Sequence, residues 1–216
     1  MHATRRRGFL RAALGLWLPT TNMNSAAKRQ LVRSCLWRRT KGEGLERFEL
    51  LREDDRWILV GTILAMDDHG PAEARYEVVC DAGWRTVQTQ VSLRATTGER
   101  SVQLTARDGR WYVNGHEEVA VRGSVDVDLG WSPSTNTLPI RRLGLAGGRS
   151  SGPLVMAWIR FPELTIEPLP QEYQHLSERT YRYTSRSGTF AADLEVDDMG
   201  VVVNYEGIWR RVEPVP

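Results

Sequence analysis

The chain has 216 residues, of which 41% are hydrophobic. That share is enough for a packed core and excludes a disordered chain. The net charge of +2 is uneven: residues 1–39 hold nine basic and no acidic residues, whereas the remainder holds 20 basic and 27 acidic residues. The folded part is therefore mildly acidic, which argues against a nucleic-acid-binding surface.

We expect residues 1–35 to form a basic tail or an export signal, separate from a domain over residues 36–213. Arg6 and Arg7 stand in a pattern that looks like a twin-arginine signal, and an apolar run follows them. That run has seven residues before Pro19, which is far too short to span a bilayer.

The alternative is that Met23 is the true start, so that residues 1–22 have no role and the protein is cytoplasmic. The two alternatives, export and translation from Met23, have almost equal support, with slightly more for Met23. No later segment is apolar over the length that a transmembrane helix needs, so we expect no transmembrane segment.

Beyond residue 44, apolar residues recur at every second position, and turn residues interrupt them every 8 to 12 positions. This spacing predicts an antiparallel all-β domain, because alternate side chains point to opposite faces of a strand. Asp108-Gly109 and Asn114-Gly115 predict tight hairpins, since these residue types tolerate positive φ angles.

Two segments depart from simple alternation. Residues 154–159 are apolar on both faces, which indicates a strand covered on both sides by a second sheet or by a ligand. Pro168 and Pro170 are expected to break the chain before residues 171–176, which form either a short helical turn or another strand.

A search for catalytic and metal sites finds little. The four His residues are widely spread, no Cys/His cluster exists, and no glycine-rich phosphate loop is present. Cys35 and Cys80 are expected to be free thiols. Residues 148–152 spell GxSxG, but Pro153 and a strand follow where a nucleophile elbow needs a helix. We therefore predict a loop there, and no metal or cofactor.

Asp126 and Asp128 share one face of a predicted strand. They could face solvent, contact nearby arginines, accept hydroxyl hydrogen bonds from a polar ligand, or act as an acid/base pair. In the segment 135–142, read as a turn or strand, Arg141 and Arg142 point to opposite faces. The inward one needs an anionic partner, which is Asp126, Asp128 or a ligand headgroup.

Six motifs in chain order resemble the bacterial “Putative glycolipid-binding” family. The resemblance runs from about Trp37 to Arg211, and Trp131-Ser132-Pro133 is a mild departure where Phe-Thr-Pro is expected. The motifs are Gly44-Leu45-Glu46, Cys80-Asp81-x-x-Trp84-Arg85-Thr86, Val125-Asp126-Val127-Asp128-Leu129-Gly130, Thr135-Asn136-Thr137-Leu138-Pro139-Ile140-Arg141-Arg142, Ala157-Trp158-Ile159-Arg160-Phe161-Pro162-Glu163-Leu164 and Tyr181-Arg182-Tyr183.

The resemblance implies a spiral β-roll of two related half-barrels and a glycolipid-binding function. An internal echo between Leu36-Trp37-Arg38-Arg39 and Ile208-Trp209-Arg210-Arg211 agrees with two similar halves. No catalytic residue of the family is available to carry over.

We therefore predict a non-enzymatic protein that binds an amphipathic small molecule, a glycolipid or lipid, in a concave β surface. The alternatives are a hydrolase that acts through Asp126 and Asp128, and a structural module without a ligand. Most of the eight Trp residues are expected in the core, and Trp84 suits stacking. The predicted ligand-binding residues are Trp84, Arg85, Asp126, Asp128, Asn136 and Arg141.

Overall fold

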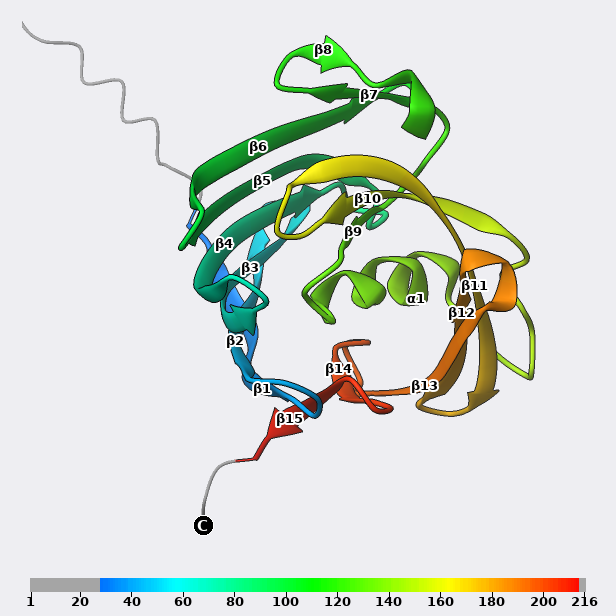
Figure 1. Cartoon of the computed structure of the whole chain (residues 1–216). Helices are drawn as coiled ribbons and strands as arrows, with labels where there is room; N and C mark the ends of the chain where they lie inside the picture. Colours follow the sequence, from blue (N-terminus) through cyan, green and yellow to red (C-terminus); the bar gives the residue numbers. More distant parts are fainter. Residues whose placement is uncertain (1–27, 214–216) are drawn as a thin grey trace, which may run out of the picture.

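The computed structural model describes residues 28–213, which form one open sheet that curls around a short helix (Figure 1). The predicted all-β architecture is confirmed. The predicted tail falls mostly outside the described residues, which include neither Arg6, Arg7 nor Met23. Within residues 28–213, none of the helices has the length and apolar character that crossing a membrane demands.

The sheet has two arms, which meet in its middle. The first arm holds β1 (Gln30–Arg39), β2 (Gly44–Glu53), β3 (Arg56–Asp67), β4 (Gly70–Cys80), β5 (Thr86–Ala95), β6 (Gly98–Arg107), β7 (Arg110–Val113) and β8 (His116–Glu117). The second arm holds β9 (Val127–Leu129), β10 (Leu154–Arg160), β11 (Thr165–Ser177), β12 (Thr180–Ser185), β13 (Phe190–Val196), β14 (Val202–Tyr205) and β15 (Trp209–Val212). The helical segments are η1 (Val119–Val121), η2 (Ser134–Asn136), α1 (Thr137–Leu143) and η3 (Arg186–Gly188).

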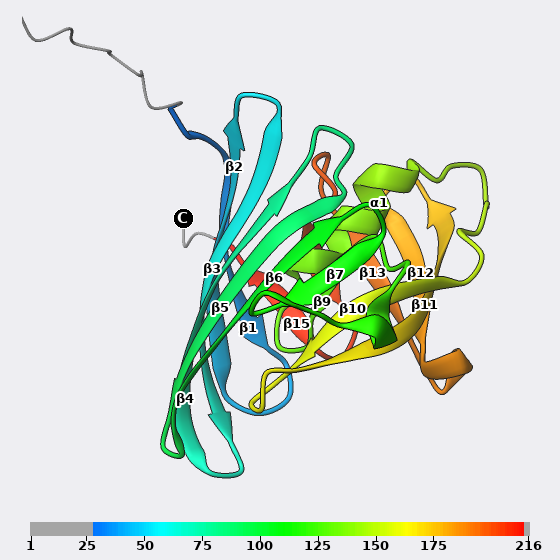
Figure 2. The same cartoon turned by 90° about the horizontal axis from the view of Figure 1, so that it is seen from above.

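Each arm is built almost entirely of hairpins between consecutive strands. The strand order is β8-β7-β6-β5-β4-β3-β2-β1-β15-β14-β13-β12-β11-β10-β9, and only β9 and β10 are parallel. The two predicted tight hairpins are confirmed: Asp108-Gly109 and Asn114-Gly115 join β6, β7 and β8 with positive φ at all four residues. Seen from above, the long strands of the first arm stand beside the second arm (Figure 2).

The arms are joined by β1 and β15, which come from opposite ends of the described chain. Arg39 pairs with Trp209, and Leu36 pairs with Val212. The two segments with similar sequences, 36–39 and 208–211, therefore lie against each other along the middle of the sheet.

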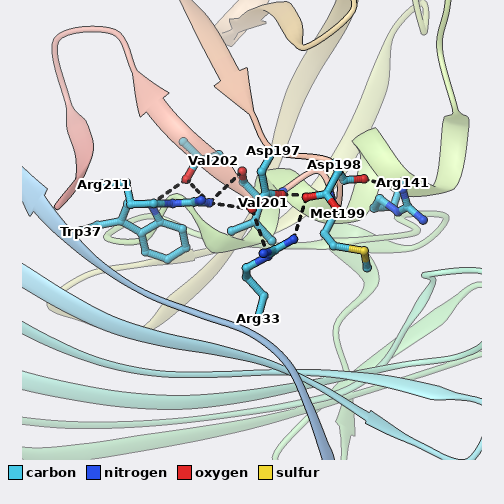
Figure 3. Close-up of polar contacts among 9 residues, drawn as sticks. All are labelled: Arg33, Trp37, Arg141, Asp197, Asp198, Met199, Val201, Val202 and Arg211. Carbon is cyan, nitrogen blue, oxygen red and sulfur yellow. Dashed lines mark hydrogen bonds and ion pairs between the residues drawn. The ribbon is translucent and has the colours of Figure 1, made fainter. Parts of the chain in front are cut away.

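Asp197, in the turn between β13 and β14, holds this junction together (Figure 3). Its Oδ1 accepts the backbone N–H groups of Met199 at 2.9 Å and Val201 at 3.0 Å. Its Oδ2 lies 3.0 Å from Nη2 of Arg211 on β15 and 3.3 Å from Nε of Arg33 on β1. One carboxylate thus links both central strands to the turn.

Residues 134–143 are helical, so the interpretation of 135–142 as a turn or strand is wrong. Pro139 is tolerated because it lies in the first turn of α1, where its missing N–H costs no helical bond. Gly144 ends the helix in a left-handed conformation and donates its N–H to the Ile140 carbonyl. The helix lies in the connection between the parallel strands β9 and β10, which require such a crossover.

The expected break at Pro168 and Pro170 is also wrong, because β11 continues through both. These prolines pair only with β10, and pairing with β12 begins at Gln171. A proline is compatible with a strand where its nitrogen faces no partner strand.

Strand β10 is covered on one face by protein and opens on a pocket with the other. Ala157 and Ile159 are fully buried opposite Val127 and Leu129 of β9. The backbone N–H of Val127 donates to Oγ1 of Thr86 on β5, which ties the edge strand β9 to the first arm. The opposite face carries Trp158, which is partly exposed.

Candidate functional site

The second arm encloses a pocket of about 200 Å³ next to the segment that leads into α1. Its walls combine aromatic rings with a few polar groups, as small-molecule sites commonly do. The lining residues are Asp128, Leu129, Gly130, Ser132, Asn136, Trp158, Leu169, Tyr183, Ser185, Arg186, Phe190, Tyr205, Ile208 and Trp209. We call this the aromatic pocket.

Asp128 is a carboxylate in the wall of this pocket. It sits in the middle of β9, directly opposite Trp158 of β10. Its Oδ2 accepts a hydrogen bond from Nε2 of Gln171. Burial raises the pKa of Asp128 to about 6, although the hydrogen bond from Gln171 acts in the opposite direction. Such a group can accept hydrogen bonds from a ligand hydroxyl once it is ionised.

A chain of hydrogen bonds connects Asp128 to Asn136, the second predicted residue in the pocket. The Tyr173 hydroxyl lies 2.8 Å from Oδ1 of Asn136 and 3.2 Å from Oε1 of Gln171. Nδ2 of Asn136 donates to the Pro133 carbonyl at 3.1 Å. Both polar groups therefore have fixed orientations before any ligand arrives, which reduces the entropic cost of binding.

The indole of Trp158 borders the pocket beside two cations. The guanidinium carbons of Arg160 and Arg186 lie 5.2 Å and 5.4 Å from its ring centroid, within the range of cation–π attraction. Gly130 makes room for this ring, because a Cβ at position 130 would lie 2.8 Å from the indole Nε1 of Trp158.

Asp126 lies behind the pocket and is not among its lining residues. Its carboxylate is fully buried and pairs with Arg142 of α1, whose Nη2 lies 2.6 Å from Oδ2. Of the three partners predicted for an inward arginine, Asp126, Asp128 or a ligand headgroup, the structure thus shows Asp126. Because the Asp126 carboxylate is fully buried and already paired with Arg142, its oxygens are not accessible to a substrate.

The other three predicted residues lie near the opposite end of α1. Trp84 is buried and stacks on Trp57, with ring centroids 4.4 Å apart. Arg141 is exposed; its guanidinium carbon lies 5.5 Å from the Trp84 centroid, and its Nη1 approaches the Asp198 carbonyl in Figure 3. Arg85 is exposed. The six predicted residues therefore do not form one site: two line the pocket and four do not.

A buried polar cluster lies beside the pocket, on the side of the first arm. The Glu46 carboxyl is fully buried, and its Oε1 accepts hydrogen bonds from the hydroxyls of Tyr76 and Ser132. Burial raises the pKa of Glu46 to about 8, against the effect of these hydroxyls and of Arg39. Tyr76 reaches Glu46 across Gly61, where a Cβ would lie only 2.4 Å from its ring.

A larger open groove, about 960 Å³, crosses one end of β1 to β5. Among its lining residues are exposed Leu64 and Met66, whose side chains are 51% and 53% accessible. Large accessible apolar groups that line a groove mark a possible place for an apolar ligand. We call this the apolar groove.

No group of three metal-ligating side chains occurs among residues 28–213. Cys35 and Cys80 are free, as predicted, and burial raises the pKa of the Cys35 thiol to about 12. The GxSxG segment leads into strand β10, and the Ser150 hydroxyl donates to Glu172. As predicted, a strand and not a helix follows it.

The family model described as “Putative glycolipid-binding” matches residues 34–211. The chain belongs to this Putative glycolipid-binding family. A crystal structure of a DUF1089 family protein from Pseudomonas aeruginosa has a similar fold, with a TM-score of 0.69 and 29% identity over 95% of this chain and 100% of that chain. No curated protein matches the chain. The resemblance seen in the sequence motifs is therefore confirmed.

Sequence reasoning missed most of the aromatic pocket in this family member. Trp209 lies in the core, as expected of most tryptophans, and also lines the pocket, whereas Trp158 is only partly buried. Gln171 and Tyr173 belong to a segment whose sequence fits a helical turn and a strand equally. The motif Tyr181-Arg182-Tyr183 carries a signal, because its two tyrosines alternate with an arginine and so face inward together, although only Tyr183 lines the aromatic pocket.

Proposed function

We propose that this protein binds an amphipathic ligand, a glycolipid or lipid, without catalysing a reaction, and that the polar headgroup enters the aromatic pocket. The observation that carries the proposal is the pairing of Asp128 with Trp158 across β9 and β10. An oriented acceptor next to a partly exposed indole suits a ring with hydroxyl groups on its rim and carbon on its faces.

The size of the pocket limits what enters it. At about 200 Å³ it is smaller than pockets for drug-sized molecules, which span roughly 300–1,000 Å³. A headgroup fits, whereas the apolar chains need another place. We assign the apolar chains to the apolar groove, whose lining adjoins that of the pocket: Thr40 of the groove donates its backbone N–H to the carbonyl of Ile208 of the pocket at 2.9 Å.

The family description supports a binding function, because it names a ligand class and no reaction. The buried Asp126–Arg142 pair also removes one member of the acid/base pair that a hydrolase would need. We therefore favour a carrier or sensor of amphipathic molecules over an enzyme.

The proposal is tested by titrating the purified protein with a neutral alkyl glycoside below its micelle concentration, using calorimetry. Trp158→Ala and Asp128→Asn are each expected to weaken binding by about tenfold, because each loses an oriented contact. Arg141→Ala is expected to leave binding unchanged. If Arg141→Ala weakens binding while the two pocket variants do not, the site lies at the other end of α1 and the proposal is wrong.

A further inference from the structure

Arg39 is the last residue of β1 and lies between two tryptophan rings. Its guanidinium carbon is 5.2 Å from the centroid of Trp209, its partner on β15, and 5.3 Å from that of Trp131. Gly44 leaves room for the arginine stem, since a Cβ at that position would lie 2.8 Å from Cδ of Arg39. The guanidinium therefore lies within cation–π range of two indole rings.

The rim of this guanidinium makes no hydrogen bond or ion pair with any of residues 28–213. Arg142 and Arg211, whose side chains are also sheltered, both contact a carboxylate at 3.0 Å or less. A cation–π contact does not use up the N–H groups of a guanidinium, which stay able to donate hydrogen bonds. Arg39 thus keeps a set of coplanar donors without an acceptor.

The nearest buried carboxyl does not neutralise Arg39. Glu46 accepts its hydrogen bonds from Tyr76 and Ser132, and its raised pKa leaves it largely protonated near neutral pH. Burial in turn lowers the pKa of Arg39, which Glu46 partly offsets. A sheltered cation without a counter-charge favours the binding of an anion.

The position of Arg39 specifies which part of a ligand it would meet. It lines the apolar groove, and Trp209, one of the two rings beside its guanidinium, lines the aromatic pocket. Of the other charged groove residues, Glu73 pairs with Arg75 and Arg94 pairs with Glu99, each at 2.8 Å. Arg38 and Glu43 also line the groove and carry opposite charges.

We propose that the edge of the Arg39 guanidinium binds an oxyanion, a carboxylate or phosphate, at the polar end of the ligand's apolar chain. The inference rests on the proposed function and narrows its ligand to an anionic amphiphile. A guanidinium edge matches such groups because two parallel N–H donors reach two oxygens of one anion. The apolar chain would then extend along the groove past Ala65 and Ala72, which lie on the same face of the sheet as Arg39.

The test compares three ligands with the same twelve-carbon chain: dodecanoate, monododecyl phosphate and neutral dodecyl maltoside. Arg39→Gln is expected to weaken binding of at least one anionic ligand by about tenfold or more, because a charge-assisted bidentate contact is lost. Binding of the neutral glycoside is expected to change less than about twofold. The two anionic ligands show whether the site prefers carboxylate or phosphate.

Arg38→Gln is the matched control, because it removes the same charge from the neighbouring residue, whose side chain points to the opposite face of β1 from Arg39. It is expected to leave all three affinities unchanged, and circular dichroism checks that both variants fold. The inference is overturned if Arg39→Gln weakens neutral and anionic ligands alike, or if Arg38→Gln has the same effect. Tight binding of only the neutral glycoside would refute it while leaving the proposed function intact, and no binding of any ligand would refute both.

Discussion

Glu46 carries the most consequential buried proton in the described part of the chain. The folded protein raises the pKa of Glu46 from 4.5 to about 8, so it holds this proton far more tightly than the unfolded chain does. The contribution of Glu46 to the free energy of unfolding is therefore greatest below about pH 4.5 and declines as the pH rises to about 8.

We expect Glu46→Gln to flatten this pH dependence, because glutamine copies the protonated carboxyl and cannot ionise. Between pH 6.5 and 9, thermal unfolding of the natural protein should shift to lower temperature, with a total loss of roughly a few kcal/mol. The shift should be much smaller in the variant. This window avoids most of the effect of Asp128, whose pKa is about 6. Parallel curves for the two proteins would show that Glu46 does not titrate there.

At the scale of single residues, the sequence identified charge pairs better than it identified the pocket. The pairing of an inward arginine with Asp126 follows from the cost of burying a lone charge, which holds in any fold. The connection of Asn136 to Asp128 through Tyr173 and Gln171 depends on which strands face one another across the curl. Alternation within one strand carries no such information.

At the scale of elements, the glycine at position 61 sets how β3 and β4 pack. Gly61 pairs with Tyr76 and lies beneath its ring. Gly61→Ala is expected to destabilise the protein by about 1–3 kcal/mol through overpacking, seen as a lower midpoint in urea unfolding. Gly83→Ala is the control, since its new methyl group would meet only Asp81 at 3.4 Å. Equal midpoints for the two variants would contradict this account.

Hairpins were predictable where the chain itself encodes the turn. Asp108-Gly109 and Asn114-Gly115 demand positive φ, and no distant contact is needed to impose it. Helix α1 escaped detection because seven residues are too short for helical periodicity to show. Gly144, just after the helix, and Arg141 and Arg142, in the last turn of the helix, are nevertheless typical of a helix end. The prolines of β11 wrongly suggested a break in the chain. Whether a proline fits in a strand depends on which neighbouring strand its nitrogen faces, and that is set by the whole sheet.

At the scale of the whole molecule, the two arms depend on the junction of β1 with β15. Arg211→Met would leave the sheltered Asp197 carboxylate with Arg33 as its remaining cation. We expect a loss of roughly 3 kcal/mol, or a thermal midpoint lower by roughly 6–12 °C for a chain of this size. The control Arg160→Met breaks an exposed pair with Glu167 and should cost under about 1 kcal/mol. Equal small losses would show that the junction does not rely on this ion pair.

The junction also determines the order in which the strands can pair while the chain is being synthesised on the ribosome. Strands β1 to β8 can pair one after another as they emerge, because each finds its partner next to it in sequence. The edge of β1 that faces away from β2 has no partner until β15 is made. By the numbering of the two strands, β15 is synthesised about 170 residues after β1. Throughout that interval the nascent chain exposes an unpaired strand edge, which can pair with the strands of other chains and lead to aggregation.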